Sequence, residues 1–254
     1  MDNTQKFSGK ADVYQKARPS YAQAMLDFIA QNWQIGNGSM VADIGSGTGI
    51  LTRQLLGLGA RVYAVEPNAD MRAKAEEMLG DNPNFVSVIG TAEQTGLPDH
   101  SFHLVTAAAA FHWFDAERFK LECERILLPG APVVLAWNKA ELSAEINLGR
   151  ERIFKKYCPN FKGFSGGQDE GDKLKRAFFD GALQERRFPN PLSYDRQTFI
   201  NRALSASYSL IETDPEFDAY LTELGELFDQ FAVDEKIMLP QDSVVYFKGW
   251  KGAD

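Results

Sequence analysis

Three glycines at alternate positions follow a short apolar run, and their spacing predicts a cradle for a ligand. Residues 41–44 read VADI, residues 45–49 read GSGTG, and a helical pattern begins at Ile50. A strand that turns sharply into a helix needs residues that tolerate positive φ and let a ligand approach the backbone. Glycine does both. The loop is therefore expected to hold a nucleotide-type cofactor.

The position of the last glycine separates two classes of cofactor. Dinucleotide-binding loops follow the pattern G-x-G-x-x-G, in which the third glycine packs the helix against the strand. Here Ile50 occupies that third position, and Gly49 comes one residue early. The phosphate-binding pattern G-x-x-x-x-G-K-[ST] does not occur either, because no lysine follows the glycines. The loop is therefore poorly suited to a diphosphate.

A carboxylate at the end of the next expected strand suits a ribose. Residues 61–65 form a short, mostly apolar run that leads to Glu66. A carboxylate at the tip of the second strand can accept hydrogen bonds from both ribose hydroxyls of an adenosine. Pro67 and Asn68 then break the strand, and a helix with Met71 on its apolar face begins.

Strand and helix patterns alternate throughout the first half of the chain. Further apolar runs cover residues 85–89, 104–110 and 132–137, and an amphipathic helix with Asp115 as its expected N-cap precedes the last of them. This alternation is typical of an α/β fold with a doubly wound, mostly parallel sheet covered by helices on both faces. Ligands bind such sheets at the carboxyl ends of the strands. Four features are expected there: Asp43, Glu66, Glu93 and residues 111–114.

The second half of the chain predicts two more strands and a helical insert. The insert, residues 193–210 with an amphipathic helix at 215–231, falls between the sixth and last strands and would lie over the carboxyl edge of the sheet as a lid. The other expected elements are helices at 141–158 and 173–179, a flexible break at 163–167, and strands at 183–188 and 243–250.

Several segments resemble successive motifs of the class I S-adenosylmethionine-dependent methyltransferases. They read VADIGSGTGILT, VYAVEPNADM, GTAEQTGLPDHSF and ERILLPGAPVVLAW. The FHWF segment and the N-terminal FSGKADVYQKARPSY are similar to the small-molecule, type 11-like branch that includes the trans-aconitate methyltransferases. The resemblance covers roughly residues 7–138 and is thin from 139 to about 240. It implies a Rossmann-like, seven-stranded single domain over residues 1–254. The expected parts are an N-terminal cap (1–35), a cofactor-binding core (36–138), late core elements with the lid (139–242) and the last strand (243–254).

The resemblance also implies a set of residues that hold S-adenosyl-L-methionine. The glycines would approach its methionine part, Asp43 would orient the loop and meet the ammonium, and Glu66 would take the ribose. The alternatives are an ordinary tight turn for the loop, core packing for Met71 and a helix-start acid for Glu93. The full set of expected cofactor contacts is Tyr14, Arg18, Asp43, Gly45, Ser46, Gly47, Gly49, Glu66, Pro67, Asn68, Met71, Thr91, Ala92, Glu93, Ala109 and Phe111.

The aromatic segment after the fourth strand is expected to face the transferable methyl group. Aromatic faces attract cations such as a sulfonium at short range, so Phe111 is the candidate beside the cofactor and Trp113 is a candidate for the acceptor pocket. His112 is a candidate general base, with a structural histidine as the alternative. His100 falls in an expected turn, and His103 falls at the opposite end of the fourth strand. Expected substrate contacts, with ordinary packing as the alternative for those in the lid, are Trp113, Tyr194, Arg202 and Tyr208.

Composition narrows the possible partners. The chain has 27 basic and 35 acidic residues and a net charge of −8, which disfavours a nucleic-acid partner. No apolar run reaches membrane-span length and no signal-peptide pattern is present, so no membrane partner is expected. The chain has two cysteines, Cys123 and Cys158, and this low number suggests a reducing cytoplasm. No Cys/His spacing typical of a zinc site occurs, so no metal is expected. A monomer or homodimer is expected.

These observations predict an S-adenosylmethionine-dependent methyltransferase that acts on a small molecule. The loop after the fourth strand lacks the Asn/Asp-Pro-Pro-aromatic sequence that the resemblance associates with methylation of planar amino groups. The acceptor atom is therefore expected to be oxygen, in a carboxylate or a hydroxyl, with carbon also open. The alternatives are a non-catalytic S-adenosylmethionine-binding protein and an NAD-dependent oxidoreductase, which Ile50 disfavours.

Overall fold

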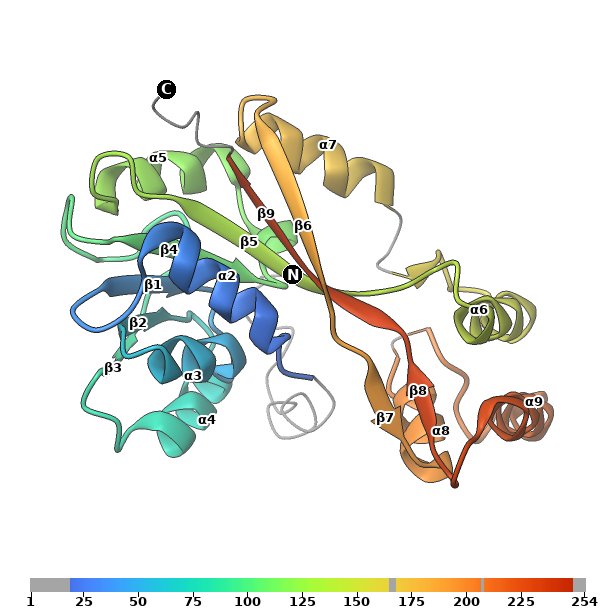
Figure 1. Cartoon of the computed structure of the whole chain (residues 1–254). Coiled ribbons are helices and arrows are strands. Elements are labelled where there is room, and N and C mark those ends of the chain that lie inside the picture. The colour runs from blue at the N-terminus through green and yellow to red at the C-terminus, as the bar shows by residue number, and fades with distance from the viewer. Residues whose placement is uncertain (1–18, 165–167, 207, 249–254) are drawn as a thin grey trace. The chain divides into compact units, whose positions relative to one another are not determined.

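The structure, a computed structural model, describes residues 19–164, 168–206 and 208–248, and it divides into two compact units. The first, called the sheet unit, comprises Met1–Trp137, Glu170–Phe188 and Ser243–Asp254. The second, called the helical unit, comprises Asn138–Asp169 and Pro189–Asp242. Figure 1 follows the chain through both units.

A seven-stranded sheet with the order β3-β2-β1-β4-β5-β9-β6 organises the sheet unit. The pairs β1–β2, β1–β4, β2–β3 and β4–β5 are all parallel. The chain winds outward from β1 to β3 and then returns to the other side of β1, so β1 and β4 mark the switch point where such sheets bind ligands. The strands are β1 (Met40–Ile44), β2 (Arg61–Val65), β3 (Phe85–Val88), β4 (Leu104–Ala108), β5 (Val133–Ala140), β6 (Leu183–Pro189) and β9 (Gln241–Lys248).

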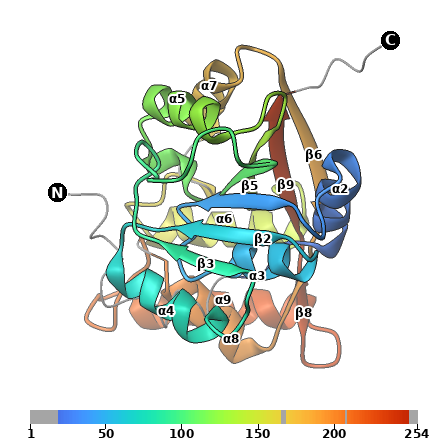
Figure 2. The same cartoon turned by 90° about the vertical axis from the view of Figure 1, so that its left-hand side faces the viewer.

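Both faces of the sheet are covered, which explains why its strands read as continuous apolar runs. Successive residues of β1 point to opposite faces: Val41 packs in the core beneath α2 and α3, and Ala42 packs in the core beneath α5 and α7. Figure 2 shows these helices on the two sides of the sheet. None of the described helices is long and apolar enough to cross a membrane. The helices of this layer structure are α2 (Gln23–Trp33), α3 (Ile50–Gly57), α4 (Ala69–Leu79), α5 (Ala116–Ile126) and α7 (Gln168–Phe178).

The helical unit has its own core, built from helices and an antiparallel pair of strands. Helices α6 and α9 pack closely, since a Cβ added to Gly149 would lie 2.5 Å from Leu227 Cδ1. Phe154 and Tyr220 are fully buried between these elements. The elements are α6 (Glu145–Tyr157), α8 (Arg196–Leu204), α9 (Phe217–Phe231) and the antiparallel pair β7 (Leu192–Tyr194) and β8 (Ile237–Leu239).

The predicted α/β, Rossmann-like sheet is confirmed, and most of its element boundaries lie within a few residues of the prediction. Asp115 caps α5 as expected, because its carboxylate accepts the Arg118 backbone N–H at 3.1 Å. The third strand is one residue shorter than predicted, and Ile89 is 76% exposed.

The expected helical insert at 193–210 is partly wrong. Tyr194 belongs to β7, and α8 ends at Leu204. The cause is a tertiary pairing with Ile237–Leu239, which local sequence does not reveal. The position of the insert over the sheet edge stays a prediction, and residues 165–167 of the expected flexible break lie outside the described residues.

Helix α2, within the segment expected to form a cap, belongs to the core of the sheet unit. Met25 and Ile29 are fully buried against Val245 and Phe247 of β9, and the Trp33 ring centroid lies 5.2 Å from that of Phe247.

Truncation of Met25 tests the role of α2 in the fold. Met25→Ala should lower the free energy of unfolding by about 2–5 kcal/mol, because it leaves a cavity in a closed core. Gln31→Ala, at an exposed position of the same helix, should change it little. Urea denaturation measures both, and a Met25→Ala protein as stable as the wild type would contradict this role of α2.

Candidate functional site

A buried carboxylate anchors the end of β1 beneath the glycine loop. Asp43 is 1% exposed and accepts hydrogen bonds from Thr52 Oγ1 at 2.6 Å and Thr106 Oγ1 at 2.8 Å. Burial raises the pKa of Asp43 to about 6, against these two hydrogen bonds, which lower it. Because Thr52 lies on α3 and Thr106 on β4, Asp43 joins three elements at the switch point. This geometry fits the predicted role of orienting the loop.

The three glycines of the loop have different roles. Each has a positive φ: 65° at Gly45, 59° at Gly47 and 81° at Gly49. A Cβ on Gly45 would lie 2.7 Å from Ala110 Cβ, and one on Gly49 would lie 2.7 Å from Leu79 Cδ1. Gly45 and Gly47 line a pocket, whereas Gly49 starts α3 and packs it against α4. Helix packing accounts for a glycine at position 49, and its predicted contact with a ligand stays a prediction.

Glu66 joins the end of β2 to the glycine loop. Its Oε2 accepts the Gly47 N–H at 2.9 Å, and its Oε1 accepts the Asn68 N–H at 2.8 Å. Arg72 holds the Glu66 backbone by donating to its carbonyl oxygen at 2.9 Å. Burial raises the pKa of Glu66 above its ordinary value. An ionised carboxylate has about four lone-pair sites, so two remain for the donors of a ligand.

Asn68 caps α4. Its side-chain oxygen accepts the Met71 N–H at 3.0 Å. Met71 is buried on its helix and lines the pocket at one edge, so its core position is established and the cofactor contacts of both residues stay predictions.

The tips of β3 and β4 supply a further wall. Thr91, Ala92 and Glu93 line the pocket after β3. Glu93 Oε1 accepts the Asp115 N–H at 2.9 Å, next to the first turn of α5. This contact agrees with the helix-start role and leaves the second carboxylate oxygen available. Ala109 follows β4 with a φ of 51°, a strained conformation for a residue other than glycine, and such strain clusters at functional sites.

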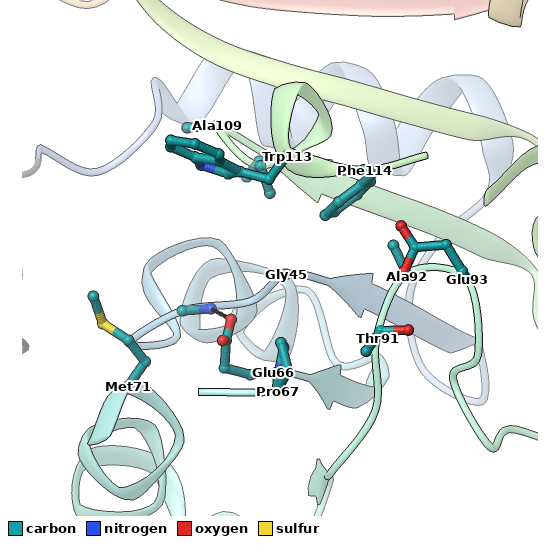
Figure 3. Close-up of a pocket in the computed structure, with 13 residues that line it drawn as sticks. Gly45, Glu66, Pro67, Met71, Thr91, Ala92, Glu93, Ala109, Trp113 and Phe114 are labelled. Carbon is teal, nitrogen blue, oxygen red and sulfur yellow. Dashed lines mark hydrogen bonds between the residues drawn. The ribbon is translucent and has the colours of Figure 1, made fainter. Parts of the chain in front are cut away.

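The aromatic segment turns two of its rings into the pocket and one away. Trp113 and Phe114 line the pocket, opposite Glu66 and Pro67 (Figure 3). Phe111 is 2% exposed and packs in the core, with its ring centroid 5.0 Å from that of Phe178. Phe111 does not line the pocket, and its expected place beside the cofactor stays a prediction. The short 3₁₀ turn Phe111–Trp113 directs Phe111 inward.

His112 is exposed on the same turn, with its ring centroid 4.6 Å from that of Trp113. It is not among the residues that line the pocket, so its role as a base stays a prediction. His103 accepts the Met40 N–H through Nδ1 at 3.1 Å, at the expected opposite end of β4.

The pocket brings together ten of the predicted site residues in the sheet unit. These are Gly45, Gly47, Glu66, Pro67, Met71, Thr91, Ala92, Glu93, Ala109 and Trp113. Sequence reasoning missed Phe114, Ala108 and Ala110, although the FHWF segment contained the signal for Phe114. Asp43, Ser46, Gly49 and Asn68 support the pocket from outside its lining, and Tyr14 and Arg18 lie outside the described residues.

The remaining candidates belong to the helical unit. Arg202 Cζ lies 5.6 Å from the Tyr194 ring centroid. Burial raises the pKa of Tyr194 and of Tyr208, and the positive charges of Arg202 and Arg150 act against this rise. Arg150 was missed, because one arginine in an amphipathic helix gives no sequence signal of burial.

The residues of the pocket fit S-adenosylmethionine. Glu66 can take ribose hydroxyls, and the aromatic faces of Trp113 and Phe114 suit a sulfonium. The buried hydroxyls of Ser46 and Thr48, in the loop itself, have no hydrogen-bond partner among the described residues. Within residues 19–164, 168–206 and 208–248, no cluster of His, Cys, Asp and Glu could hold a metal ion.

Comparisons with known proteins agree with this geometry. The family described as Methyltransferase domain matches residues 42–135. An uncharacterized methyltransferase of Mycobacterium tuberculosis is 35% identical over 137 residues, which are 54% of this chain and 54% of that protein. An uncharacterized methyltransferase-like protein of Schizosaccharomyces pombe is 32% identical over 132 residues, 51% of this chain and 50% of that protein.

Solved structures share the fold. A protein of Anaeromyxobacter dehalogenans assigned as a type II methyltransferase has a TM-score of 0.66 at 20% identity, over 91% of this chain and 97% of that one. A phosphoethanolamine N-methyltransferase of Haemonchus contortus, solved with phosphomonomethylethanolamine and S-adenosylhomocysteine, has a TM-score of 0.53 at 15% identity, over 97% of this chain and 58% of that one.

Residues 42–135 of the chain thus match a methyltransferase domain, and the motifs in this part resemble those of the class I S-adenosylmethionine-dependent methyltransferases. The cofactor of this class is S-adenosyl-L-methionine. The chain spans about half the length of the curated relatives described here.

Removal of the Glu66 charge tests the ribose contact. Glu66→Gln should weaken S-adenosylhomocysteine binding by about ten- to hundredfold, because hydrogen bonds to a charged group contribute about 1.5–3 kcal/mol. Glu77→Gln, on the exposed side of α4, is the matched control. Isothermal titration calorimetry gives both dissociation constants, and equal values would refute the assignment.

The raised pKa of Asp43 predicts a dependence of stability on pH. The folded pKa of about 6 lies above the ordinary 3.8, so the folded state binds more protons than the unfolded state between these values. The wild type should therefore lose stability relative to Asp43→Asn as the pH rises from 4 to 6, by up to about 3 kcal/mol, and the difference should level off above 6. Urea titrations of both proteins across this range measure it, and parallel pH curves would contradict the assignment.

Proposed function

We propose that this protein transfers the methyl group of S-adenosylmethionine to an oxygen atom of a small molecule. The observation that supports this proposal most strongly is the convergence of Glu66, the glycine loop and an aromatic wall on one pocket at the switch point of the sheet. The net charge of −8 favours a small-molecule acceptor over a phosphate backbone.

The residues of the chain bind and align the reactants. S-adenosylmethionine, when bound, supplies an electrophilic methyl group on sulfur. Gly45 and Gly47 would admit the cofactor to the loop backbone, Glu66 would fix its ribose, and Thr91 to Glu93 would contact the adenine. Trp113 and Phe114 would cover the sulfonium side of the pocket and exclude water. Such alignment is the main contribution that a protein makes to an in-line displacement.

The type of acceptor decides whether a base is needed. A carboxylate oxygen is already nucleophilic, whereas a hydroxyl must lose a proton. His112, exposed at the tip that follows β4, is the candidate for that proton. The absence of the Asn/Asp-Pro-Pro-aromatic sequence in residues 109–114 favours oxygen over a planar amino group.

Turnover with two classes of acceptor tests the proposed function. The protein and S-adenosylmethionine are incubated with panels of small carboxylates and small alcohols or phenols, and release of S-adenosylhomocysteine is followed. We expect release with at least one panel. Failure to bind either form of the cofactor would refute the proposed function.

Substitution of His112 tests the base. His112→Ala should abolish transfer to a hydroxyl, leave transfer to a carboxylate within about twofold, and leave the dissociation constant of the cofactor unchanged, because only the hydroxyl needs a general base. His103→Ala at the opposite end of β4 is the control. Unchanged turnover of a hydroxyl acceptor by His112→Ala would remove this role.

A further inference from the structure

The helical unit contains a buried arginine whose charge is not balanced by a carboxylate in the described part of the chain. Arg150 lies on α6 and is 9% exposed. Its Nη1 donates to Asn147 Oδ1 at 2.8 Å, which is its one hydrogen bond among the described residues. A guanidinium has five N–H donors. Most of the donors of Arg150 are therefore available in a site that excludes bulk water.

Aromatic rings offset only part of the cost of this buried charge. Arg150 Cζ lies 5.0 Å from the Phe164 ring centroid and 5.6 Å from that of Phe154. Contacts of this kind are weaker than the hydration that a cation loses when it is buried. The rings also supply no hydrogen-bond acceptor, so apart from the bond to Asn147 the donors of the guanidinium stay without an acceptor among the described residues.

Three further donors lie close to Arg150, from other elements of the same unit. Burial, and then the charge of Arg202 on α8, lowers the pKa of Arg150 to about 10. Arg202 Cζ lies 5.6 Å from the ring centroid of Tyr194 in β7. The Tyr208 ring centroid lies 5.4 Å from that of Phe154, a ring that Arg150 also contacts. Two cations and two phenols thus lie in one core, and none of the largest influences on the pKa of Arg150 comes from an acidic side chain.

We propose that Arg150, Arg202, Tyr194 and Tyr208 bind an oxyanion, a carboxylate or a phosphate, of a small molecule. A planar guanidinium matches both groups through paired N–H···O bonds, and phenol hydroxyls complete their coordination.

Direct binding of simple anions to the full chain tests the site. The probes are adipate, inorganic phosphate and neutral adipamide, titrated calorimetrically at fixed ionic strength. We expect adipate, phosphate or both to bind and adipamide not to bind. Arg150→Gln should weaken anion binding by about ten- to hundredfold, because charged hydrogen bonds are lost. Arg152→Gln removes the same charge from an exposed position of α6 and should leave binding unchanged.

The stability of the ligand-free protein separates a binding arginine from a structural one. If the guanidinium is held for a ligand, Arg150→Gln should melt at the same temperature as the wild type or higher, because an uncompensated buried charge is gone. Its affinity for S-adenosylhomocysteine should not change. Loss of anion binding with intact cofactor binding supports the proposal.

Three results would overturn the anion site: no binding of either anion to the wild type, equal binding to wild type and Arg150→Gln, or failure of Arg150→Gln to fold. A protein that has the anion site but no cofactor site would give a different pattern. Anions would then bind while S-adenosylhomocysteine did not, which would refute the proposed function and leave the anion site standing.

Discussion

The pocket at the switch point of the sheet depends on one buried carboxylate. Asp43 accepts two hydroxyl donors, from α3 and from β4, in a core from which water is excluded. An isolated carboxylate there would cost several kcal/mol, so the two hydrogen bonds are necessary for its burial. They fix the end of β1 relative to both neighbours. The glycine loop that follows is therefore held open at the switch point rather than collapsing onto the sheet.

The pocket is held in place by contacts within the sheet unit. Glu66 is fixed by two backbone N–H groups, one of them from the glycine loop itself, and Ala109 holds a strained conformation at the tip of β4. A site that is already arranged loses less conformational entropy on binding. The aromatic wall of Trp113 and Phe114 stands opposite Glu66 (Figure 3), so the polar and the cationic parts of one ligand can be met from two sides.

Sequence predicted the sheet and most of the residues that line the pocket because both depend on local patterns. Buried parallel strands are continuous apolar runs, and a glycine loop followed by a strand-end acid is typical of a nucleoside-binding site. It did not predict that Phe114 lines the pocket, because the rotation of the 3₁₀ turn depends on packing against the distant Phe178. It missed β7 because pairing with β8 joins residues far apart in the chain. It missed Arg150 because one arginine in an amphipathic helix gives no signal of its burial beside Phe164.

The most direct test of the cofactor site is a crystal structure of the full chain with S-adenosylhomocysteine. We expect the ribose hydroxyls on the Glu66 carboxylate, the adenine beside Thr91–Glu93 and the sulfur on the side of Trp113 and Phe114. A nucleoside bound elsewhere, with Glu66 contacting only the backbone N–H groups of Gly47 and Asn68 as it does now, would contradict the assignment of this pocket to the cofactor.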